Sequence, residues 1–146
     1  MVLKKHHNLI AVLLASIIVP AVWTDDTSAE VNMPARGICA HRGASDTHPE
    51  NTIAAFREAV RLGAQMIEFD VRKSRDDQLF LYHDLTLVQL TGQEQRPEEL
   101  TLAELKAIDA GSWKAPRFRG ERIPTLEETL TIMPVNVWLF AHVQLG

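Results

Sequence analysis

The chain has 146 residues and a formal net charge of −4, with 46% hydrophobic and 23% charged residues. This length suffices for one domain with a buried core, and the composition is that of a globular protein. The basic residues are scattered, which excludes the charged surface typical of nucleic-acid-binding proteins. The single cysteine, Cys39, excludes an internal disulfide, and its apolar neighbours predict a buried, unreactive thiol.

The first 29 residues differ in character from the rest of the chain. Lys4 and Lys5 precede an apolar run over residues 9–23, which is short for a membrane span and typical of a signal-peptide core. We expect residues 1–29 to be a secretory signal peptide, with an uncleaved signal anchor or a buried helix as the alternatives. The mature chain, residues 30–146, would then be periplasmic or extracellular and free of a stable membrane anchor.

The first predicted elements of the mature chain are a short strand over residues 37–40 and a helix over residues 53–62. Apolar side chains recur along residues 53–62 at helical spacing, and either Asn51 or Thr52 can cap the start of this helix. A second strand, rich in apolar residues, is predicted over residues 66–71.

The second half of the chain continues the alternation of strands and helices. A strand over residues 79–83 follows a tight polar turn. Residues 101–104 and 125–128 both match the capping box, so each stretch predicts the start of a helix. The last predicted strand covers residues 135–143.

Strands that alternate with helices favour a parallel sheet covered by helices. A complete (β/α)8 barrel needs roughly 250 residues, and this sequence contains only four predicted strands. We therefore expect an α/β fold of the TIM-barrel type in which about the first four β/α units are present. A truncated gene product is the simplest explanation for such a half-barrel.

Polar side chains concentrate where the predicted strands end. Glu68 and Asp70 lie two residues apart on one strand, so both carboxylates point to the same face. Neighbouring carboxylates on an apolar strand repel each other and are costly to bury, and a divalent cation is the usual remedy. His41 and Arg42 follow the first strand, and His83 ends the third. This combination indicates an active site for phosphate ester chemistry.

Taken in order, the motifs of the chain resemble those of the glycerophosphodiester phosphodiesterase family, within the phospholipase-C-like phosphodiesterases. The matching stretches are residues 41–43, 49–52, 68–71, 83–84, 100–105, 110–113 and 123–128. The likeness covers residues 37–144 and corresponds to the N-terminal half of the family's barrel. It implies hydrolysis of small glycerophosphodiesters to sn-glycerol 3-phosphate and an alcohol such as choline or ethanolamine.

The resemblance also implies a role for each matching residue. His41 and His83 correspond to the general acid and base, in an order that the sequence leaves open. Arg42 corresponds to a phosphate clamp, although an ion pair with Glu50 or Asp70 is an alternative.

The resemblance further implies a site for a divalent metal ion, Ca²⁺ or Mg²⁺ by expectation. Glu68 and Asp70 correspond to its ligands, and Glu50 to a further carboxylate of the same site. The family's last matching strand carries a glutamate ligand and then a lysine, but here those places hold His142 and Gln144. Histidine favours zinc or manganese over calcium or magnesium, and His142 can equally be a structural histidine.

Two other functions stay open from the sequence. One is a catalytically silent barrel fragment or interaction module that keeps the motifs by descent. The other is a sphingomyelinase-D-like or phosphatidylinositol-cleaving phosphodiesterase with the same histidine and carboxylate arrangement. A half-barrel would also expose unpaired strand edges and apolar surface, so we expect self-association or a partner half.

Overall fold

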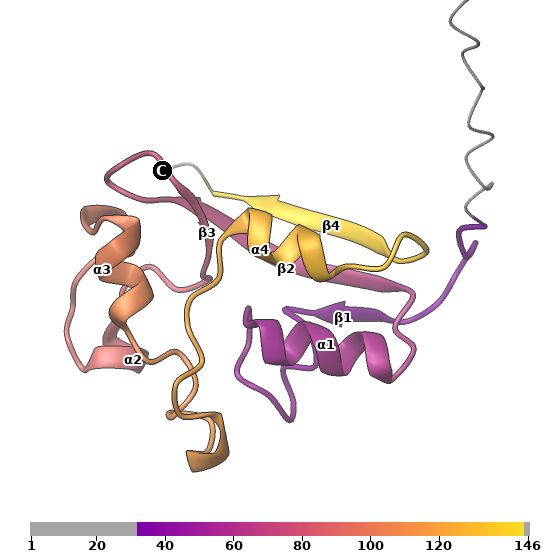
Figure 1. Ribbon diagram of the computed structural model, residues 1–146, viewed down its shortest axis with the longest axis horizontal. Coiled ribbons are helices and arrows are strands. Elements are labelled where there is room, and N and C mark those ends of the chain that lie inside the picture. Colours follow the sequence, from indigo (N-terminus) through magenta and orange to yellow (C-terminus); the bar gives the residue numbers. More distant parts are fainter. Residues whose placement is uncertain (1–31, 145–146) are drawn as a thin grey trace, which may run out of the picture.

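The computed structural model of the chain describes residues 32–144, so the predicted signal peptide lies outside the described residues. The strands are β1 (Cys39–His41), β2 (Met66–Lys73), β3 (Leu79–Leu81) and β4 (Trp138–Val143) (Figure 1). The helices are α1 (Ile53–Arg61), α2 (Val88–Thr91), α3 (Leu102–Ala107) and α4 (Leu126–Ile132), with short 3-10 helices at Pro97–Glu99 and Pro116–Phe118. Within residues 32–144, no helix is long and apolar enough to cross a membrane.

Strand β2 forms the centre of a single four-stranded sheet. β1 and β4 pair with β2 in parallel, and β3 pairs with the end of β2 in antiparallel orientation. The carbonyl groups of Glu68 and Asp70 point to one edge of β2, where they accept hydrogen bonds from the N–H groups of Arg42 (3.0 Å) and Tyr82 (3.2 Å). β1 and β3 therefore follow one another along that edge, and β4 lies along the other.

The structure confirms an α/β fold with an open parallel sheet, but the expectation of four parallel strands is wrong. Three strands are parallel, and β3 forms a hairpin with β2. Only the turn 74–78 separates β2 from β3. A parallel connection needs a crossover of about a dozen residues or more, so this turn is too short for one.

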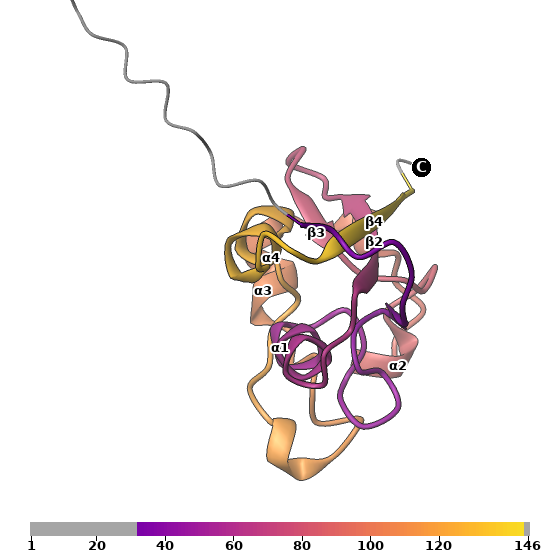
Figure 2. The ribbon, with the colours of Figure 1, turned by 90° about the vertical axis from the view of Figure 1, so that its right-hand side faces the viewer.

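Helices α1 and α4 cover one face of the sheet, where they form a layer beneath β2 (Figures 1 and 2). Thr52 caps α1 by accepting a hydrogen bond from the N–H of Ala55 at 3.3 Å, which decides between the two predicted caps. The core between these layers consists of Phe56, Ala59, Ile67, Phe69, Val71 and Leu81. Because alternate residues of β2 fill this core, its other residues point to the opposite face.

The connection between β3 and α4 packs around a second apolar cluster. Its buried members are Phe80, Tyr82, Leu87, Leu105, Ala110 and Ile123. Both predicted capping boxes are confirmed, with Thr101 and Glu104 closing the start of α3 and Thr125 and Glu128 closing the start of α4.

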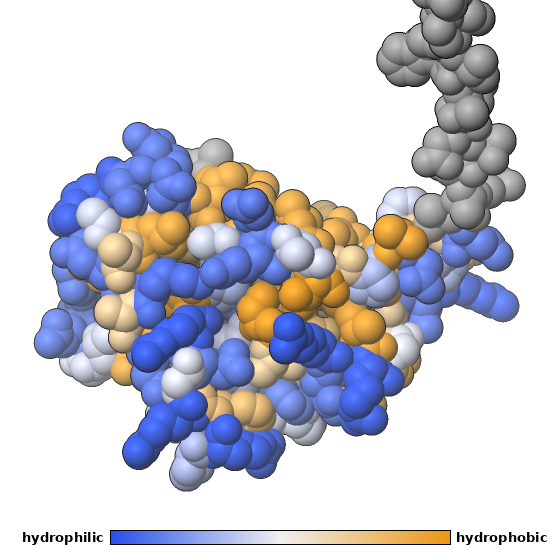
Figure 3. Space-filling model, in the orientation of Figure 1, coloured by the Kyte–Doolittle hydropathy of each residue, from blue (hydrophilic) through white to orange (hydrophobic). Residues whose placement is uncertain are grey.

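The outer strands expose apolar surface. All six residues of β4 are exposed, and Trp138, Leu139 and Phe140 are 46%, 37% and 58% accessible. Figure 3 shows hydrophobic side chains over the region where β4 and α4 lie. The expected self-association through such edges stays a prediction.

The expectation of a buried Cys39 is wrong, because β1 is an edge strand and leaves this thiol exposed. Partial burial raises the pKa of Cys39, and the negative charge of Glu68 raises it further. A raised pKa lowers the thiolate fraction, which favours low reactivity, but the low reactivity itself stays a prediction.

Candidate active site

A tight turn after β1 brings the first functional residues against β2. Arg42 and Gly43 both have positive φ angles, 57° and 82°. A side chain at Gly43 would meet the backbone of Ala55 at 2.8 Å, so only glycine fits this close approach to α1. The N–H of Arg42 donates to both the backbone oxygen and the side-chain Oε2 of Glu68, each at 3.0 Å. This turn therefore fixes Arg42 beside the carboxylates of β2.

The predicted carboxylate pair is buried on the face of β2 that α1 does not cover. Glu68 is 7% accessible and Asp70 is 1% accessible. The imidazole Nε2 of His41 lies 3.9 Å from Glu68 Oε2, and the His41 side chain is 66% exposed. An exposed imidazole beside a buried carboxylate is free to contact a small molecule at the open face of the sheet.

Four polar side chains surround the carboxylate of Asp70. Its Oδ2 atom accepts a hydrogen bond from Asn51 Nδ2 at 2.9 Å and lies 3.4 Å from Arg42 Nε. Its Oδ1 atom lies 3.0 Å from His142 Nδ1 and 3.2 Å from Gln144 Nε2. Since Asp70 is fully buried, these contacts compensate for the loss of its hydration.

The guanidinium of Arg42 connects two acidic groups. Its Nη1 atom lies 3.0 Å from Glu50 Oε1, and its Nε atom faces Asp70. Both ion pairs that the sequence offered as alternatives to a phosphate clamp are therefore present.

The predicted site residues fall into two neighbouring groups. Glu68, Asp70 and His142 each offer an atom within 4.8 Å of the others. Glu50, His83 and Asp84 form the second such group, in which His83 Nδ1 lies 2.8 Å from Asp84 Oδ1. The structure thus places Glu50 beside His83, and Arg42 links Glu50 to Asp70 of the first group.

Comparison with known proteins connects this geometry to a family. Residues 41–146 match the model of the glycerophosphoryl diester phosphodiesterase family. The chain belongs to this family. The resemblance that the motifs indicated is therefore confirmed.

Individual phosphodiesterases agree with this assignment. The chain is 52% identical over 93 residues to YhdW of Bacillus subtilis, covering 64% of this chain and 38% of that protein. It is 46% identical over 96 residues to a glycerophosphodiester phosphodiesterase of Caldanaerobacter subterraneus, covering 66% of this chain and 40% of that enzyme. The chain thus spans about 40% of the length of these relatives.

Solved structures of phosphodiesterases show the same fold over part of their length. An Oleispira antarctica phosphodiesterase in complex with the product sn-glycerol-3-phosphate matches with a TM-score of 0.72 and 35% identity, covering 76% of this chain and 45% of that chain. A glycerophosphodiester phosphodiesterase of Agrobacterium tumefaciens matches with a TM-score of 0.69 and 36% identity, covering 73% and 46%. The described residues therefore have the fold of a part of these larger phosphodiesterases.

Phosphodiesterases of this family are generally metal-dependent, and the residues present fit a divalent cation. Glu68 and Asp70 offer hard oxygen ligands, which suit calcium, magnesium and manganese. The third donor, His142, offers a nitrogen, which suits manganese or zinc better. The donor set is therefore compatible with a divalent metal ion but less favourable for calcium or magnesium than three carboxylates would be.

Sequence reasoning missed two residues that support the site. Asn51 is predicted as a possible helix cap and lies in the matching stretch 49–52, but the sequence assigns it no role at the site; it lies at a positive φ of 53° and bonds both the side chain and the backbone N–H of Asp70. Arg72 has no predicted role. Its position two residues after Asp70 was the available signal, because alternation along the strand places both side chains on one face.

Proposed function

We propose that this chain carries the chemistry of its family, the metal-dependent hydrolysis of glycerophosphodiesters to sn-glycerol 3-phosphate and an alcohol. The observation that carries the proposal is the buried pair Glu68 and Asp70, with Arg42 held against it and His41 exposed beside it. A relative of similar fold was solved with sn-glycerol-3-phosphate bound, which supports this product.

Glu68 and Asp70 are the residues that we assign to the metal ion, with His142 as a third donor. A bound divalent cation would neutralise charge on the phosphate oxygens and orient the diester. The exclusion of water around these carboxylates strengthens their attraction for a cation, because charges interact more strongly where water is scarce.

His41 and His83 are the groups that we assign to proton transfer. The contact between His83 Nδ1 and the Asp84 carboxylate favours a proton on Nδ1, which leaves Nε2 as the basic atom. His41 is exposed and can approach a substrate that binds over Glu68. Histidine suits both tasks because its ordinary pKa lies near neutrality.

Arg42 contributes to substrate binding in this proposal. Its Nη1 and Nε atoms face Glu50 and Asp70, and its side chain is 18% exposed. Among the described residues, Arg42 Nη1 donates a hydrogen bond to Glu50 and no hydrogen bond is formed by Nη2, so we assign Nη2 to a phosphate oxygen. Arg42 would therefore bind the phosphate through one nitrogen, whereas a bidentate arginine uses two.

The silent-fragment hypothesis remains a second candidate, because specific observations favour it. β4 is exposed along its length, and His142 on β4 and Gln144 just after it stand where the resemblance implies a glutamate and a lysine. A lysine beside the phosphate would add a positive charge that glutamine does not supply. The likeness to the glycerophosphodiester phosphodiesterase from Caldanaerobacter supports a glycerophosphodiester as the substrate of this chain, in preference to sphingomyelin or phosphatidylinositol.

The test is release of glycerol 3-phosphate from glycerophosphocholine by the purified chain, with calcium, magnesium or manganese added. We expect metal-dependent release that His41→Ala and Glu68→Ala abolish. Glu58→Ala is the matched control, since Glu58 lies on α1 and pairs with Arg61. Release that persists in Glu68→Ala would contradict the proposal, and no release from a folded, soluble chain would favour the silent fragment.

A further inference from the structure

Arg72 is a buried charge on the strand that carries the proposed metal ligands. It follows Glu68 and Asp70 on the same face of β2, and its side chain is only 3% exposed. A buried guanidinium is costly unless it is paired and hydrogen-bonded. The partners of Arg72 therefore indicate what this residue contributes.

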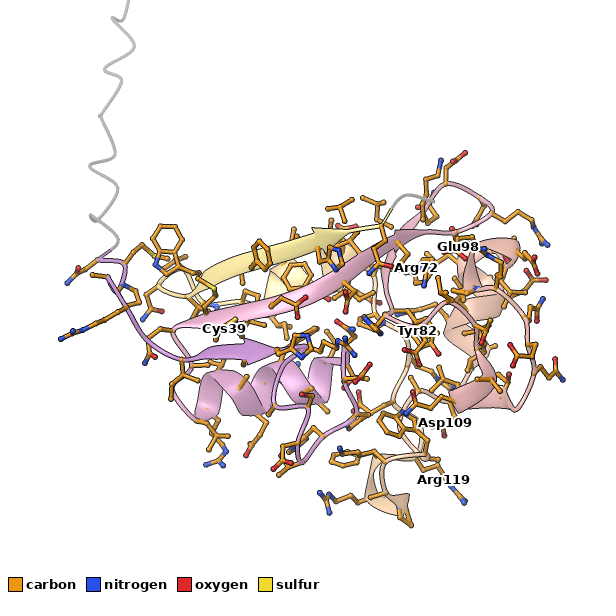
Figure 4. The ribbon with its side chains drawn as sticks, turned by 180° about the vertical axis from the view of Figure 1, so that it is seen from behind. Cys39, Arg72, Tyr82, Glu98, Asp109 and Arg119 are labelled. Carbon is orange, nitrogen blue, oxygen red and sulfur yellow. The ribbon has the colours of Figure 1, made fainter. Side chains whose placement is uncertain are left out.

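Those partners are the backbone carbonyl groups of His83 and Asp84 and the carboxylate of Glu98. Nη1 of Arg72 donates to the carbonyl oxygen of His83 at 3.1 Å and to that of Asp84. Nη2 forms an ion pair with Glu98, which lies in the 3-10 helix Pro97–Glu99. Figure 4 shows Arg72 and Glu98 next to each other at the end of β2.

His83 and Asp84 lie beyond the end of β3, so a contact with the sheet is needed to hold these two residues in place. The residue pairs of β2 and β3 end with Val71 and Leu81, and one further backbone bond joins the Tyr82 N–H to the Asp70 carbonyl, so His83 is the first residue beyond the backbone bonds to β2. The side-chain contact between His83 and Asp84 joins sequence neighbours, so it cannot fix the segment relative to the sheet. Arg72 lies on β2, so its side-chain contacts can hold the segment in place relative to the sheet.

We propose that Arg72 is a positioning residue for His83. By holding the carbonyls of His83 and Asp84, its guanidinium fixes the histidine relative to Glu68 and Asp70 on the same strand. Glu98 supplies the counter-charge that allows the guanidinium to be buried. The catalytic part of this inference rests on the proposed function, since it assumes that His83 transfers a proton.

Two variants test the proposal. Removing the guanidinium alone would leave the Glu98 carboxylate without its partner, so Arg72→Met is combined with Glu98→Gln. Arg72→Lys keeps the positive charge but lacks the planar fork that serves several acceptors at once. Arg75→Met is the control. Arg75 is exposed and bonds the same connection through the Glu99 carbonyl and Glu104, away from His83.

The first measurement is the NMR signal of the His83 ring in histidine-labelled protein, with folding checked by circular dichroism. We expect this signal to shift or split in both Arg72 variants, while the His41 ring signal stays and Arg75→Met changes neither. An unchanged His83 signal in either folded Arg72 variant would overturn the proposal. If the double variant does not fold, Arg72→Lys alone decides.

The second measurement is turnover of glycerophosphocholine. Misplacing a proton-transfer group should lower kcat by about tenfold or more, with KM and the metal concentration for half-activation little changed. An inactive wild-type chain would refute the proposed function. The NMR measurement would still test the positioning role, because the ring signal of His83 does not depend on turnover. An unchanged kcat in an active Arg72 variant would contradict positioning.

Discussion

The Nδ1 atom of His142 lies 3.0 Å from the Oδ1 atom of Asp70, where β4 and β2 pair in parallel. This contact places a nitrogen donor at the position where the family resemblance implies a carboxylate ligand. A neutral imidazole is also one negative charge short of a glutamate. The contact should therefore determine which metal ion the site prefers.

We predict that the wild-type chain binds manganese or zinc more tightly than calcium or magnesium, and that His142→Glu strengthens the binding of calcium and magnesium. An added carboxylate should tighten calcium or magnesium binding by about tenfold or more, because these ions prefer charged oxygen ligands. Isothermal titration calorimetry with each metal measures the change. His142→Gln is the control, since it removes the imidazole without adding charge and should not improve magnesium binding.

Asn51 should stabilise the fold as well as the site. It is 3% accessible and bonds Asp70 twice, through Nδ2 at 2.9 Å and Oδ1 at 3.2 Å. Asn51→Ala should lower the free energy of unfolding by about 2–4 kcal/mol, because Asp70 loses both of its hydrogen bonds to Asn51 and alanine is strained at a φ of 53°. Asn51→Gly loses the same bonds without the strain and should cost about 1 kcal/mol less. Urea denaturation that finds equal costs would exclude the strain.

Gly43 and Gly63 form a natural pair for testing the turn before the site. Their φ angles are 82° and 80°, but a side chain at Gly43 would meet Ala55 at 2.8 Å, whereas one at Gly63 has nothing within 4 Å. Gly63→Ala should cost about 1–2 kcal/mol of stability from backbone strain alone. Gly43→Ala should cost about 1–3 kcal/mol more, because it also overpacks the contact with α1. Thermal melts of both variants provide the comparison, and similar melting temperatures would refute it.

Asp109 should make the fold sensitive to acid. Its carboxylate accepts backbone N–H bonds from Ser112, Gly120 and Gly111, which hold the pKa of Asp109 well below its usual range. The stabilisation is therefore complete above the unfolded carboxyl pKa of about 3.9 and is lost as the pH falls through the folded pKa. Asp109→Asn should lower the melting temperature at neutral pH, and this difference should shrink below about pH 4. A difference that stays constant on acidification would contradict the prediction.

Local features of the fold were predictable because their signals lie within a few residues. In the capping boxes at 101–104 and 125–128, the threonine and the glutamate bond each other's backbone N–H groups, so each box forms from residues within the same short stretch. The alternation of Glu68 and Asp70 likewise depends only on the strand that contains them. The antiparallel direction of β3 was also within reach, since the turn 74–78 is too short for a crossover.

Which site residues lie together depends on side-chain contacts that cannot be predicted from the sequence. Arg42, held at a positive φ, joins the Glu50 group to the Glu68 group, because it reaches Glu50 with one nitrogen and Asp70 with another. Nothing in the linear spacing of these residues specifies that bridge. The exposure of Cys39 likewise depends on the position of β1 at the sheet edge. An apolar run in the sequence does not distinguish an edge strand from a central strand.

Strand β2 is the one strand among the described residues with partners on both edges, and this determines where the backbone is most protected. Its amides bond to β4 on one side and to β1 and then β3 on the other, so hydrogen–deuterium exchange should be slowest there. In β4, alternate amides face away from β2 and should exchange early. Among the described residues, Glu68, Asp70 and Arg72 thus stand on the strand whose backbone should open most slowly, whereas His142 stands on an edge strand.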